Sequence, residues 1–285
     1  MKVAITGATG LLGKAFIKKY AKELEIIAIS RKPNIPDTVY SDFSFESLTR
    51  IFSGVDGLIH FAAQRLHSSD SYISNYELDK TVFLSAKKSK VKNVLFSSSR
   101  GVYGTASAPW KETSQVAPNN LYALEKAQSE LFASFLNMTC DMRIKCLRVA
   151  QVLSENEYKG SMIHTFIGNA HRGIDNEVSV EGIFREYIYI EDLLDAFYIA
   201  LQHKDLHGIY NVGTGNGISI LDIAKCISKS FDKNSKVFQK KKLKKIVENS
   251  VMDISLFTNA FSWKPRYTFD TAMHEIANKV KNNDT

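Results

Sequence analysis

Short apolar runs alternate with longer amphipathic stretches through the first 150 residues. The runs that read as strands lie at 3–5, 26–29, 57–61, 93–96 and 146–149, and helices fit the stretches 11–22, 44–53, 70–89 and 119–137. Strands that are apolar on both faces and separated by helices indicate a parallel sheet covered on both sides. The pattern predicts an α/β fold with a doubly wound parallel sheet, which binds ligands at the carboxyl ends of its strands.

The pattern becomes less regular after about residue 152. We expect helices at 161–171 and 191–202, strands at 186–190 and 209–212, and a turn at 213–217 after which Ser219 can cap a further helix. The organisation predicted from this is a first domain over 1–152, to which the chain returns at about 186–212. A smaller C-terminal lobe then lies within 153–285, built from 153–185 and 213–285.

Composition bears on the size of the core and on the compartment in which the protein is expected. The chain has 285 residues, of which 44% are hydrophobic, so it can bury a full core. It has no apolar run of about 18 residues and no signal-peptide pattern, so no membrane association is expected. The cysteines Cys140, Cys146 and Cys226 show no C-x-x-C spacing and indicate free thiols in a reducing compartment. We therefore expect a cytoplasmic protein.

The positive net charge is concentrated in one segment. The formal net charge is +7, and five lysines lie within 240–245. A run of this kind is typical of a solvated face of a helix or loop. The alternative is a contact with a polyanionic ligand such as a diphosphate.

A glycine-rich turn joins the first strand to the first helix. Gly7 permits a tight turn, Gly10 allows close approach of a pyrophosphate, and Gly13 allows the helix to pack against the strand. The helix opens with Leu11 and Leu12, whose amides would face the phosphates. The spacing is G-x-x-G-x-x-G, which differs from the common G-x-G-x-x-G fingerprint. Its position predicts a dinucleotide phosphate site.

The end of the second strand bears on the choice of cofactor. NAD-binding chains usually carry an acid there, but this strand ends in Ser30 and Arg31. Arg31 suits the 2′-phosphate of NADP, or it is solvated or stacks on the adenine, so NADP and NAD both stay open. Asp42 can reach the adenine amine or cap the helix that starts near Ser44.

A tyrosine and a lysine four residues apart occur twice in the chain. Tyr122 and Lys126 share one face of a helix, and so do Tyr76 and Lys80. The spacing alone decides nothing, because chance produces it in a chain of this length. Tyr122 follows the strand that ends in the serines 97–99, at the edge where a nicotinamide would lie. We expect Tyr76 to pack or to contact a second subunit.

These features together resemble the extended short-chain dehydrogenase/reductases of the NAD-dependent epimerase/dehydratase family, which act on nucleotide sugars. The likeness covers nearly the whole chain. It is carried by the segments 7–13, 60–63, 97–104, 185–192, 211–213 and 262–265, together with Asn75, Tyr122, Lys126 and Arg148.

The resemblance implies roles for these residues. Tyr122 would be the acid/base, Lys126 would assist it and hold the nicotinamide ribose, and Ser99 would hydrogen-bond the reacting oxygen. The remaining contacts are implied in the same way: Ala62, Ala63 and Asn75 at the cofactor, Phe43 at its adenine, Gln151 at the substrate and Arg185 at the nucleotide diphosphate. A second phosphate-binding arginine is not evident, and Lys242 or Lys244 would substitute for it. The family also implies a homodimer built on helices 70–89 and 119–137.

Departures from the family pattern reduce the number of reactions that the chain is expected to catalyse. Sugar 4,6-dehydratases carry acidic groups just after the catalytic serine or threonine, where this chain has Arg100 and Gly101. The 3,5-epimerase/reductases carry a cysteine at the position of Gly101. A 4-ketoreductase using exchangeable NADPH and a 4-epimerase with tightly bound NAD both fit, and Arg31 favours the reductase.

Functions of other classes are less well supported. A non-catalytic relative that binds RNA or senses redox state would suit the lysine run. It would give no purpose to Ser99, Tyr122 and Lys126, so no nucleic-acid partner is expected. The seven histidines show no metal-ligand spacing, so no metal is expected.

Overall fold

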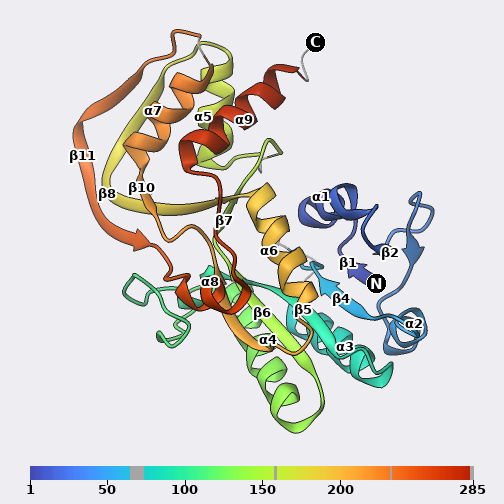
Figure 1. The fold of residues 1–285 in the computed structure, drawn as a ribbon. Coiled ribbons are helices and arrows are strands. Elements are labelled where there is room, and N and C mark those ends of the chain that lie inside the picture. The colour runs from blue at the N-terminus through green and yellow to red at the C-terminus, as the bar shows by residue number, and fades with distance from the viewer. Residues whose placement is uncertain (65–73, 157–158, 232, 283–285) are drawn as a thin grey trace.

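The computed structural model describes residues 1–64, 74–156, 159–231 and 233–282, and the side chains of 241–247 lie outside this description. Within the described residues a parallel sheet of seven strands has the order β3-β2-β1-β4-β5-β6-β9 (Figure 1). These strands are β1 (Lys2–Thr6), β2 (Glu25–Ser30), β3 (Val39–Tyr40), β4 (Gly57–His60), β5 (Asn93–Ser99), β6 (Arg143–Val149) and β9 (Gly208–Val212). The strand order reverses between β1 and β4, which confirms the doubly wound parallel sheet.

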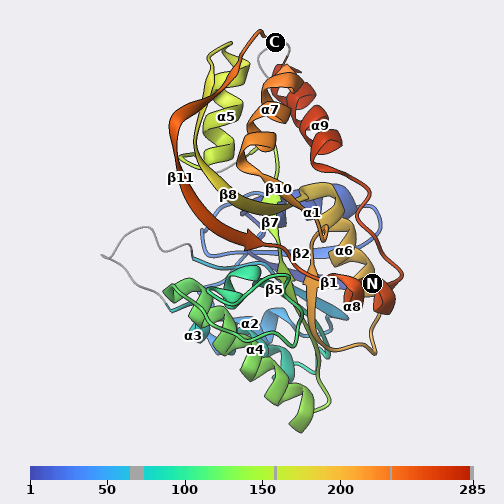
Figure 2. The same cartoon turned by 90° about the vertical axis from the view of Figure 1, so that its left-hand side faces the viewer.

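Helices cover both faces of this sheet (Figures 1 and 2). On one side lie α1 (Leu11–Tyr20) and α6 (Ile190–Gln202), and on the other lie α2 (Phe45–Ile51), α3 (Asn75–Lys88) and α4 (Leu121–Thr139). Because successive strand residues point to opposite faces, Val3 and Ile5 of β1 pack with Phe16 in one core. Ala4 packs with Phe83 in the other core. The two cores fix the helices against the sheet.

The predicted helices agree with the structure to within a few residues. The helix predicted over 70–89 is observed as α3, and 70–73 lies outside the described residues. Side-chain caps define several starts, since Ser44, Ser74 and Asn120 each accept a hydrogen bond from the amide three residues later. Ser219 caps the next helix through the amide of Asp222, as predicted. Among the described helices, none has both the length and the apolar character needed to cross a membrane.

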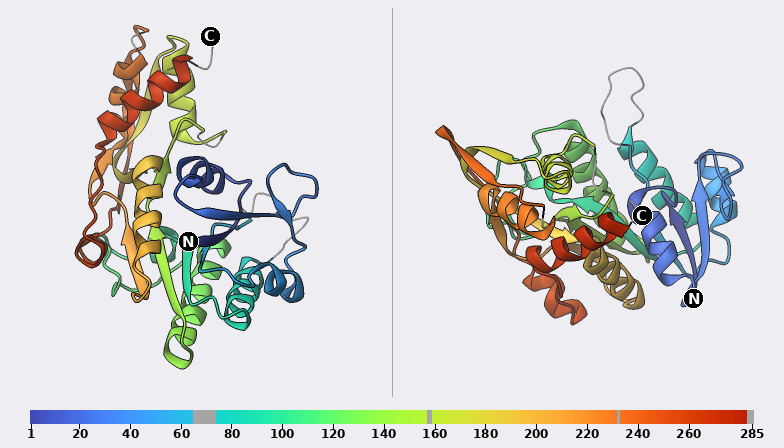
Figure 3. Two further views of the ribbon diagram at one scale, coloured as in Figure 1. Left: turned by 45° about the vertical axis from the view of Figure 1, so that its right-hand side comes forward. Right: turned by 90° about the horizontal axis from the view of Figure 1, so that it is seen from above.

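A second sheet lies beside the first. It has the order β10-β8-β11, and β7 also pairs with β8. Its strands are β7 (Gln151–Leu153), β8 (Asn176–Tyr189), β10 (Gly217–Ser219) and β11 (Val237–Ser250). The helices α5 (Met162–His171), α7 (Ile220–Phe231) and α9 (Phe269–Asn282) gather around it, whereas α8 (Ser255–Phe261) packs beside β9 (Figure 3). The strand expected at 186–190 is the end of β8, so that segment joins the second sheet.

The lysine run adopts a structure that the sequence did not predict. We expected a helix or loop at 240–245, but these residues belong to β11. This strand lies at the edge of the second sheet and pairs with β8 alone. Charged side chains are common on edge strands, where they oppose pairing with another chain. Lys240 also forms a 3.0 Å ion pair with Glu177 of β8.

The close approach of α1 to the loop after β1 leaves no room for a side chain at Gly13. A Cβ atom on Gly13 would lie 2.2 Å from the carbonyl oxygen of Gly7. Gly13→Ala should therefore lower the free energy of unfolding by about 2 kcal/mol, because the backbone must shift to relieve the overlap. Urea unfolding followed by circular dichroism measures this change.

Gly168→Ala is the matched control. Gly168 also lies within a helix, but its added Cβ would meet only the far end of Arg172, at 4.0 Å. Alanine is the better helix former, so this variant should gain up to about 1 kcal/mol. Equal effects of the two substitutions would contradict the steric explanation for Gly13.

Candidate active site

The loop between β1 and α1 presents backbone amides at the carboxyl edge of the sheet. Gly7 has a φ of 72°, and its carbonyl accepts a 2.9 Å hydrogen bond from Gly10. A Cβ on Gly7 would lie 2.6 Å from the amide of Ala62, so the loops after β1 and β4 are in direct contact. The helix begins at Leu11 with no side-chain cap and no acid in its first turn. The amides of 11–13 and the positive end of the helix dipole are therefore available to a phosphate.

Arg31 and Phe43 lie together at the end of β2. The Arg31 guanidinium is exposed and lies 5.9 Å from the centre of the Phe43 ring. Phe43 is buried and has a φ of 63°. Ser30 accepts a 3.0 Å hydrogen bond from the amide of Lys32, so its hydroxyl helps to form this turn. Arg31 and the neighbouring Lys32 are thus two exposed cations at this end of β2.

Asp42 does not cap the helix at 45–51 itself. Its Oδ1 accepts hydrogen bonds from both the amide and the hydroxyl of Ser44, and Ser44 caps the helix through the amide of Ser47. These bonds to Ser44 lower the pKa of Asp42 below its usual range. The capping alternative for Asp42 was therefore wrong: Asp42 orients the residue that caps.

The structure brings Ser99 and Tyr122 to one cavity and places Lys126 behind them. Ser99 ends β5, and its hydroxyl accepts a 3.0 Å hydrogen bond from the amide of Gly101 at the start of a 3-10 turn, η1 (Arg100–Tyr103). Tyr122 lies in the first turn of α4 and lines the cavity with Ser99. One turn later, Lys126 is 1% exposed, and its ammonium lies 5.9 Å from the Tyr122 ring and 4.2 Å from the Phe96 ring.

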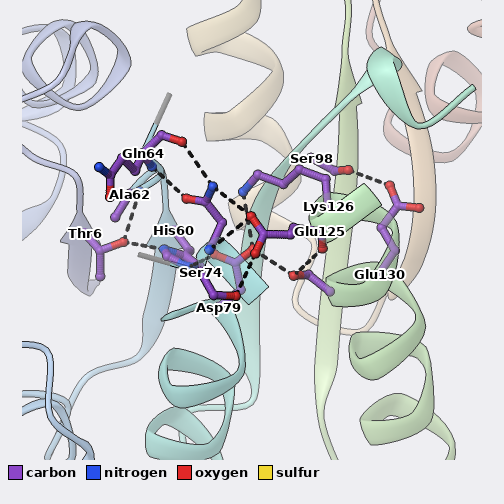
Figure 4. A network of polar contacts seen from close by, with 12 residues as sticks. Thr6, His60, Ala62, Gln64, Ser74, Asp79, Ser98, Glu125, Lys126 and Glu130 are labelled. Carbon is purple, nitrogen blue, oxygen red and sulfur yellow. Dashed lines mark hydrogen bonds and ion pairs between the residues drawn. The ribbon is translucent and has the colours of Figure 1, made fainter. Parts of the chain in front are cut away.

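A buried polar network connects Lys126 to the glycine loop (Figure 4). Lys126 Nζ lies 3.4 Å from Asp79 Oδ2, and His60 Nε2 lies 2.9 Å from Asp79 Oδ1. His60 Nδ1 lies 2.6 Å from the hydroxyl of Thr6, which directly precedes Gly7. Burial lowers the pKa of His60, so the neutral ring donates to Asp79 and accepts from Thr6. One chain of contacts thus couples α4, which carries Tyr122 and Lys126, to the glycine loop.

Asp79 was missed by sequence reasoning. Burial by itself would raise the pKa of this carboxyl, but the charge of Lys126 and the hydrogen bond from His60 lower it overall. Ser129 donates a further 2.8 Å hydrogen bond to the same carboxylate. The available signal was the spacing of four residues from Asn75, which places both side chains on one face of α3.

Asn75 holds the segment that follows Ala63. Its side-chain oxygen accepts a 2.7 Å hydrogen bond from the amide of Gln64, and its Nδ2 donates to the carbonyl of Gln64 at 3.0 Å. The same Nδ2 donates to Glu125 of α4 at 3.2 Å. Glu125 is buried and also accepts from Ser74 at 2.6 Å. The side chain of Asn75 therefore holds the backbone at Gln64, beside the expected cofactor site.

A second buried pair supports the serine strand. Arg148 of β6 donates to Glu130 of α4 through two nitrogens, the shorter contact being 2.7 Å. Ser98, next to Ser99, donates to the same carboxylate at 2.5 Å. Tyr103 stacks against the Arg148 guanidinium at 4.7 Å. These contacts hold the end of β5 in place.

The second Tyr-x-x-x-Lys pair lies away from the cavity. Tyr76 of α3 packs edge-on against Phe132 of α4, with ring centres 6.5 Å apart. Lys80 forms a 2.7 Å ion pair with Glu77. The structure thus places Tyr76 in a packing position between the two helices.

The cavity has a volume of about 1120 Å³ and lies between the two sheets. Ser99 of β5 and Tyr122 of α4 line it on one side, and Gln151 and Arg185 line it from the second sheet. Arg185 pairs through both terminal nitrogens with Glu248 of β11. Lys242 and Lys244, proposed as substitutes for a phosphate-binding arginine, have side chains outside the described part of the chain. Two further charged groups line the cavity that sequence reasoning did not assign to the site, Arg100 and Glu248.

Replacing the buried carboxylate tests its part in the fold. Asp79→Asn leaves the Lys126 ammonium buried without its counter-charge, so the free energy of unfolding at pH 7 should fall by about 3 kcal/mol. The pKa of Asp79 is lower in the folded than in the unfolded chain. Its contribution is therefore present above the unfolded-chain pKa of about 4 and is lost as the pH falls further. The gap between wild type and variant should shrink below about pH 4 in urea unfolding.

Asp141→Asn serves as the control. Asp141 is exposed and pairs with Lys92 and Arg143 on the surface. Its removal should change stability far less, since exposed ion pairs contribute little. A gap for Asp79→Asn that stayed constant between pH 7 and pH 3 would contradict the role given to the ion pair.

Comparisons with known proteins identify the family of the chain. A profile of the NAD dependent epimerase/dehydratase family matches residues 3–213. The chain is 24% identical over 308 residues to dTDP-4-dehydro-6-deoxyglucose reductase of Escherichia coli, covering 98% of this chain and 97% of that protein. It is 27% identical over 266 residues to a trifunctional UDP-glucose 4,6-dehydratase/UDP-4-keto-6-deoxy-D-glucose 3,5-epimerase/UDP-4-keto-L-rhamnose-reductase of Arabidopsis thaliana. That match covers 81% of this chain but only 40% of the plant protein.

Solved structures share the fold over the full length. UDP-N-acetylglucosamine 4-epimerase from Bacillus cereus superposes with a TM-score of 0.88 at 26% identity, covering 99% of this chain and 96% of that one. UDP-glucose 4-epimerase from Thermotoga maritima gives a TM-score of 0.82 at 20% identity and covers 100% of both chains. The family profile runs from β1 to the end of β9 and includes the glycine loop, Ser99, Tyr122 and Lys126. The chain therefore belongs to the NAD-dependent epimerase/dehydratase family of nucleotide-sugar epimerases, reductases and dehydratases.

Proposed function

We propose that the protein is a 4-ketoreductase that transfers a hydride from NADPH to C4 of a hexose carried on a nucleotide diphosphate. The observation that carries the proposal is the placement of Ser99, Tyr122, Gln151 and Arg185 around one cavity. The first two offer hydroxyls to a reacting oxygen. The second two offer an amide and a guanidinium, groups suited to a sugar hydroxyl and a phosphate.

The residues of the chain divide the proton chemistry among them. Tyr122 donates its phenolic proton to the ketone oxygen as the carbon receives the hydride. Ser99 donates a second hydrogen bond to that oxygen, since its contact with Gly101 uses only a lone pair. The Lys126 ammonium, behind the ring, stabilises the phenolate that forms. When bound, the cofactor supplies the hydride.

The first domain has features that fit a dinucleotide. The amides of 11–13 and the close contact between Gly7 and Ala62 form a cradle for the diphosphate in which a side chain would not fit. Ala62 and Ala63 line the nicotinamide side, and Phe43 lines the adenine side. Asn75 acts by fixing the segment after Ala63. Asp42, exposed beside Phe43, remains a prediction for the adenine amine.

The preference for NADPH rests on Arg31. The end of β2 carries an outward-pointing guanidinium and no acid. An arginine at this position suits a 2′-phosphate, whereas an acid would accept hydrogen bonds from the ribose hydroxyl of NAD.

The second candidate is a nucleotide-sugar 4-epimerase that retains NAD. The Bacillus and Thermotoga structures of the same fold are 4-epimerases. The same hydroxyls serve both reactions, because the epimerase only adds rotation of the ketone and a second hydride transfer. We do not propose 4,6-dehydration, because Arg100 and Gly101 stand where acidic groups would be needed.

Turnover of NADPH separates these candidates. The purified protein should contain no stoichiometric nicotinamide and should oxidise NADPH when a 4-keto-6-deoxy nucleotide sugar is added. Tyr122→Phe should lower kcat by about 100-fold or more, because the proton donor is lost. Absorbance at the NADPH band measures both results, and the same assay with NADH gives the cofactor preference.

Tyr76→Phe is the matched control, because Tyr76 shares the Tyr-x-x-x-Lys spacing but packs against Phe132. It should leave kcat unchanged. Co-purified NAD with no net consumption of NADPH would instead support the epimerase.

We also propose that the protein is a homodimer that pairs through α3 and α4. Leu124, Leu131, Phe135 and Met138 recur at helical spacing on α4 and are 43%, 73%, 51% and 80% exposed. An apolar stripe of this size on a soluble helix is typical of a protein interface. Two copies meeting here would bury it in a four-helix bundle.

Charge placed on this stripe should disrupt the dimer. The double variant Leu131→Glu/Met138→Glu should halve the mass measured by size-exclusion chromatography with light scattering, because two carboxylates per subunit would be buried unpaired. Leu256→Glu, on α8, alters a leucine that is 47% exposed elsewhere and should leave the mass unchanged. A wild-type mass equal to that of one chain would contradict the proposal.

A further inference from the structure

The cavity contains two guanidinium groups and one carboxylate beyond Ser99 and Tyr122. Arg100 directly follows Ser99, and its Nη2 donates a 3.3 Å hydrogen bond to Oε1 of Gln151. Arg185 of β8 and Glu248 of β11 line the same cavity and pair with each other, with Arg185 Nη2 at 2.9 Å from Glu248 Oε2. Arg185 and Glu248 are both close enough to Arg100 for their charges to act on its guanidinium.

The two arginines differ in what neutralises them. Arg185 has the carboxylate of Glu248, whereas the described residues supply no carboxylate within ion-pair distance of Arg100. Burial and the like charge of Arg185 both lower the pKa of the Arg100 guanidinium. A half-buried guanidinium without a counter-ion is stabilised by any oxyanion that reaches it. Gln151 orients this group but adds no charge.

Glu248 is placed so that it can leave Arg185. Its side chain is 48% exposed, and it lies on the edge strand directly after a register shift between Lys245 and Glu248. Because half of this carboxylate is already in contact with water, part of the free energy lost on breaking the pair is recovered by its hydration. Glu186, which is buried, and Glu248 both attract Arg100 from beyond ion-pair distance. If Glu248 left, Arg185 would lose its ion-pair partner, and the attraction of Glu186 for Arg100 would remain.

We propose that Arg100 adds a second guanidinium to the anion site already expected at Arg185, and that Glu248 holds Arg185 until an anionic group of the substrate displaces it. The inference rests on the proposed function, because it takes the cavity to be the nucleotide-sugar site. Two oxyanions qualify: a phosphate of the nucleotide, or a carboxylate on the sugar. Arginine suits both, since its planar fork donates two parallel hydrogen bonds.

The test is calorimetric titration with UDP, dTDP, UDP-glucose and UDP-glucuronate. Arg100→Met should weaken binding by about tenfold, because a charge-assisted contact is lost. Glu248→Gln should strengthen it by about threefold, because the internal competitor is lost. If Arg100→Met loses the same factor of affinity for all four ligands, the anion is a phosphate. If Arg100→Met loses affinity for UDP-glucuronate alone, the anion is the carboxylate of the sugar.

Matched controls use the same substitutions outside the cavity. Arg172→Met changes a surface arginine at the end of α5, and Glu177→Gln changes a surface glutamate of β8 that pairs with Lys240. Neither should alter the affinities. NADPH binding and the thermal midpoint, measured for every variant, show that the protein is folded.

The outcomes against the inference are distinct. Affinities of Arg100→Met within about twofold of wild type for all four ligands would overturn it, and so would unchanged or weaker binding by Glu248→Gln. Wild-type protein that binds NADPH but none of the four ligands would overturn the proposed function and this inference together. Tight nucleotide binding that ignores both substitutions would overturn the inference alone.

Discussion

The ion pair between Asp79 and Lys126 is the constraint on which the rest of the site depends. Both groups have almost no exposed surface, and a buried charge is tolerated only when it is paired and hydrogen-bonded. The pair therefore fixes α3 against α4. Through His60 it extends to Thr6, next to the glycine loop, and Tyr122 lies one helical turn before Lys126. Tyr122 and the glycine loop are thereby held in one fixed arrangement.

The two sheets contribute different parts of the chemistry. The first sheet and its helices carry the groups proposed for proton transfer and the amides proposed to bind a dinucleotide, all near the carboxyl edge of parallel strands. The second sheet adds Arg185 and Glu248 through two long strands that run side by side. Relatives of this fold include reductases, epimerases and dehydratases.

Sequence reasoning was most accurate where the signal was local. Strands of the first 150 residues follow from short, continuous apolar runs, and helices follow from a period of 3.6 residues, which neighbouring positions reveal. The cap at Ser219 follows from a capping side chain directly before a helix. The lysine run was assigned to a helix or loop because its charges suggest solvent, whereas it belongs to a strand at the edge of the second sheet. Asp42 was placed at the correct turn, but the capping hydroxyl belongs to Ser44.

By itself the sequence determined the alternation of strands and helices that predicts a doubly wound sheet, the glycine turn after β1, and the position of Tyr122 and Lys126 on one face of a helix. Each of these signals depends on residues a few positions apart. Only the tertiary structure decided that Arg100, Arg185 and Glu248 line one cavity, and that a carboxylate of α3 neutralises Lys126. Those neighbours are separated by dozens of residues in the chain. Their meeting depends on sheet register and on helix packing, which no local pattern of residue types specifies.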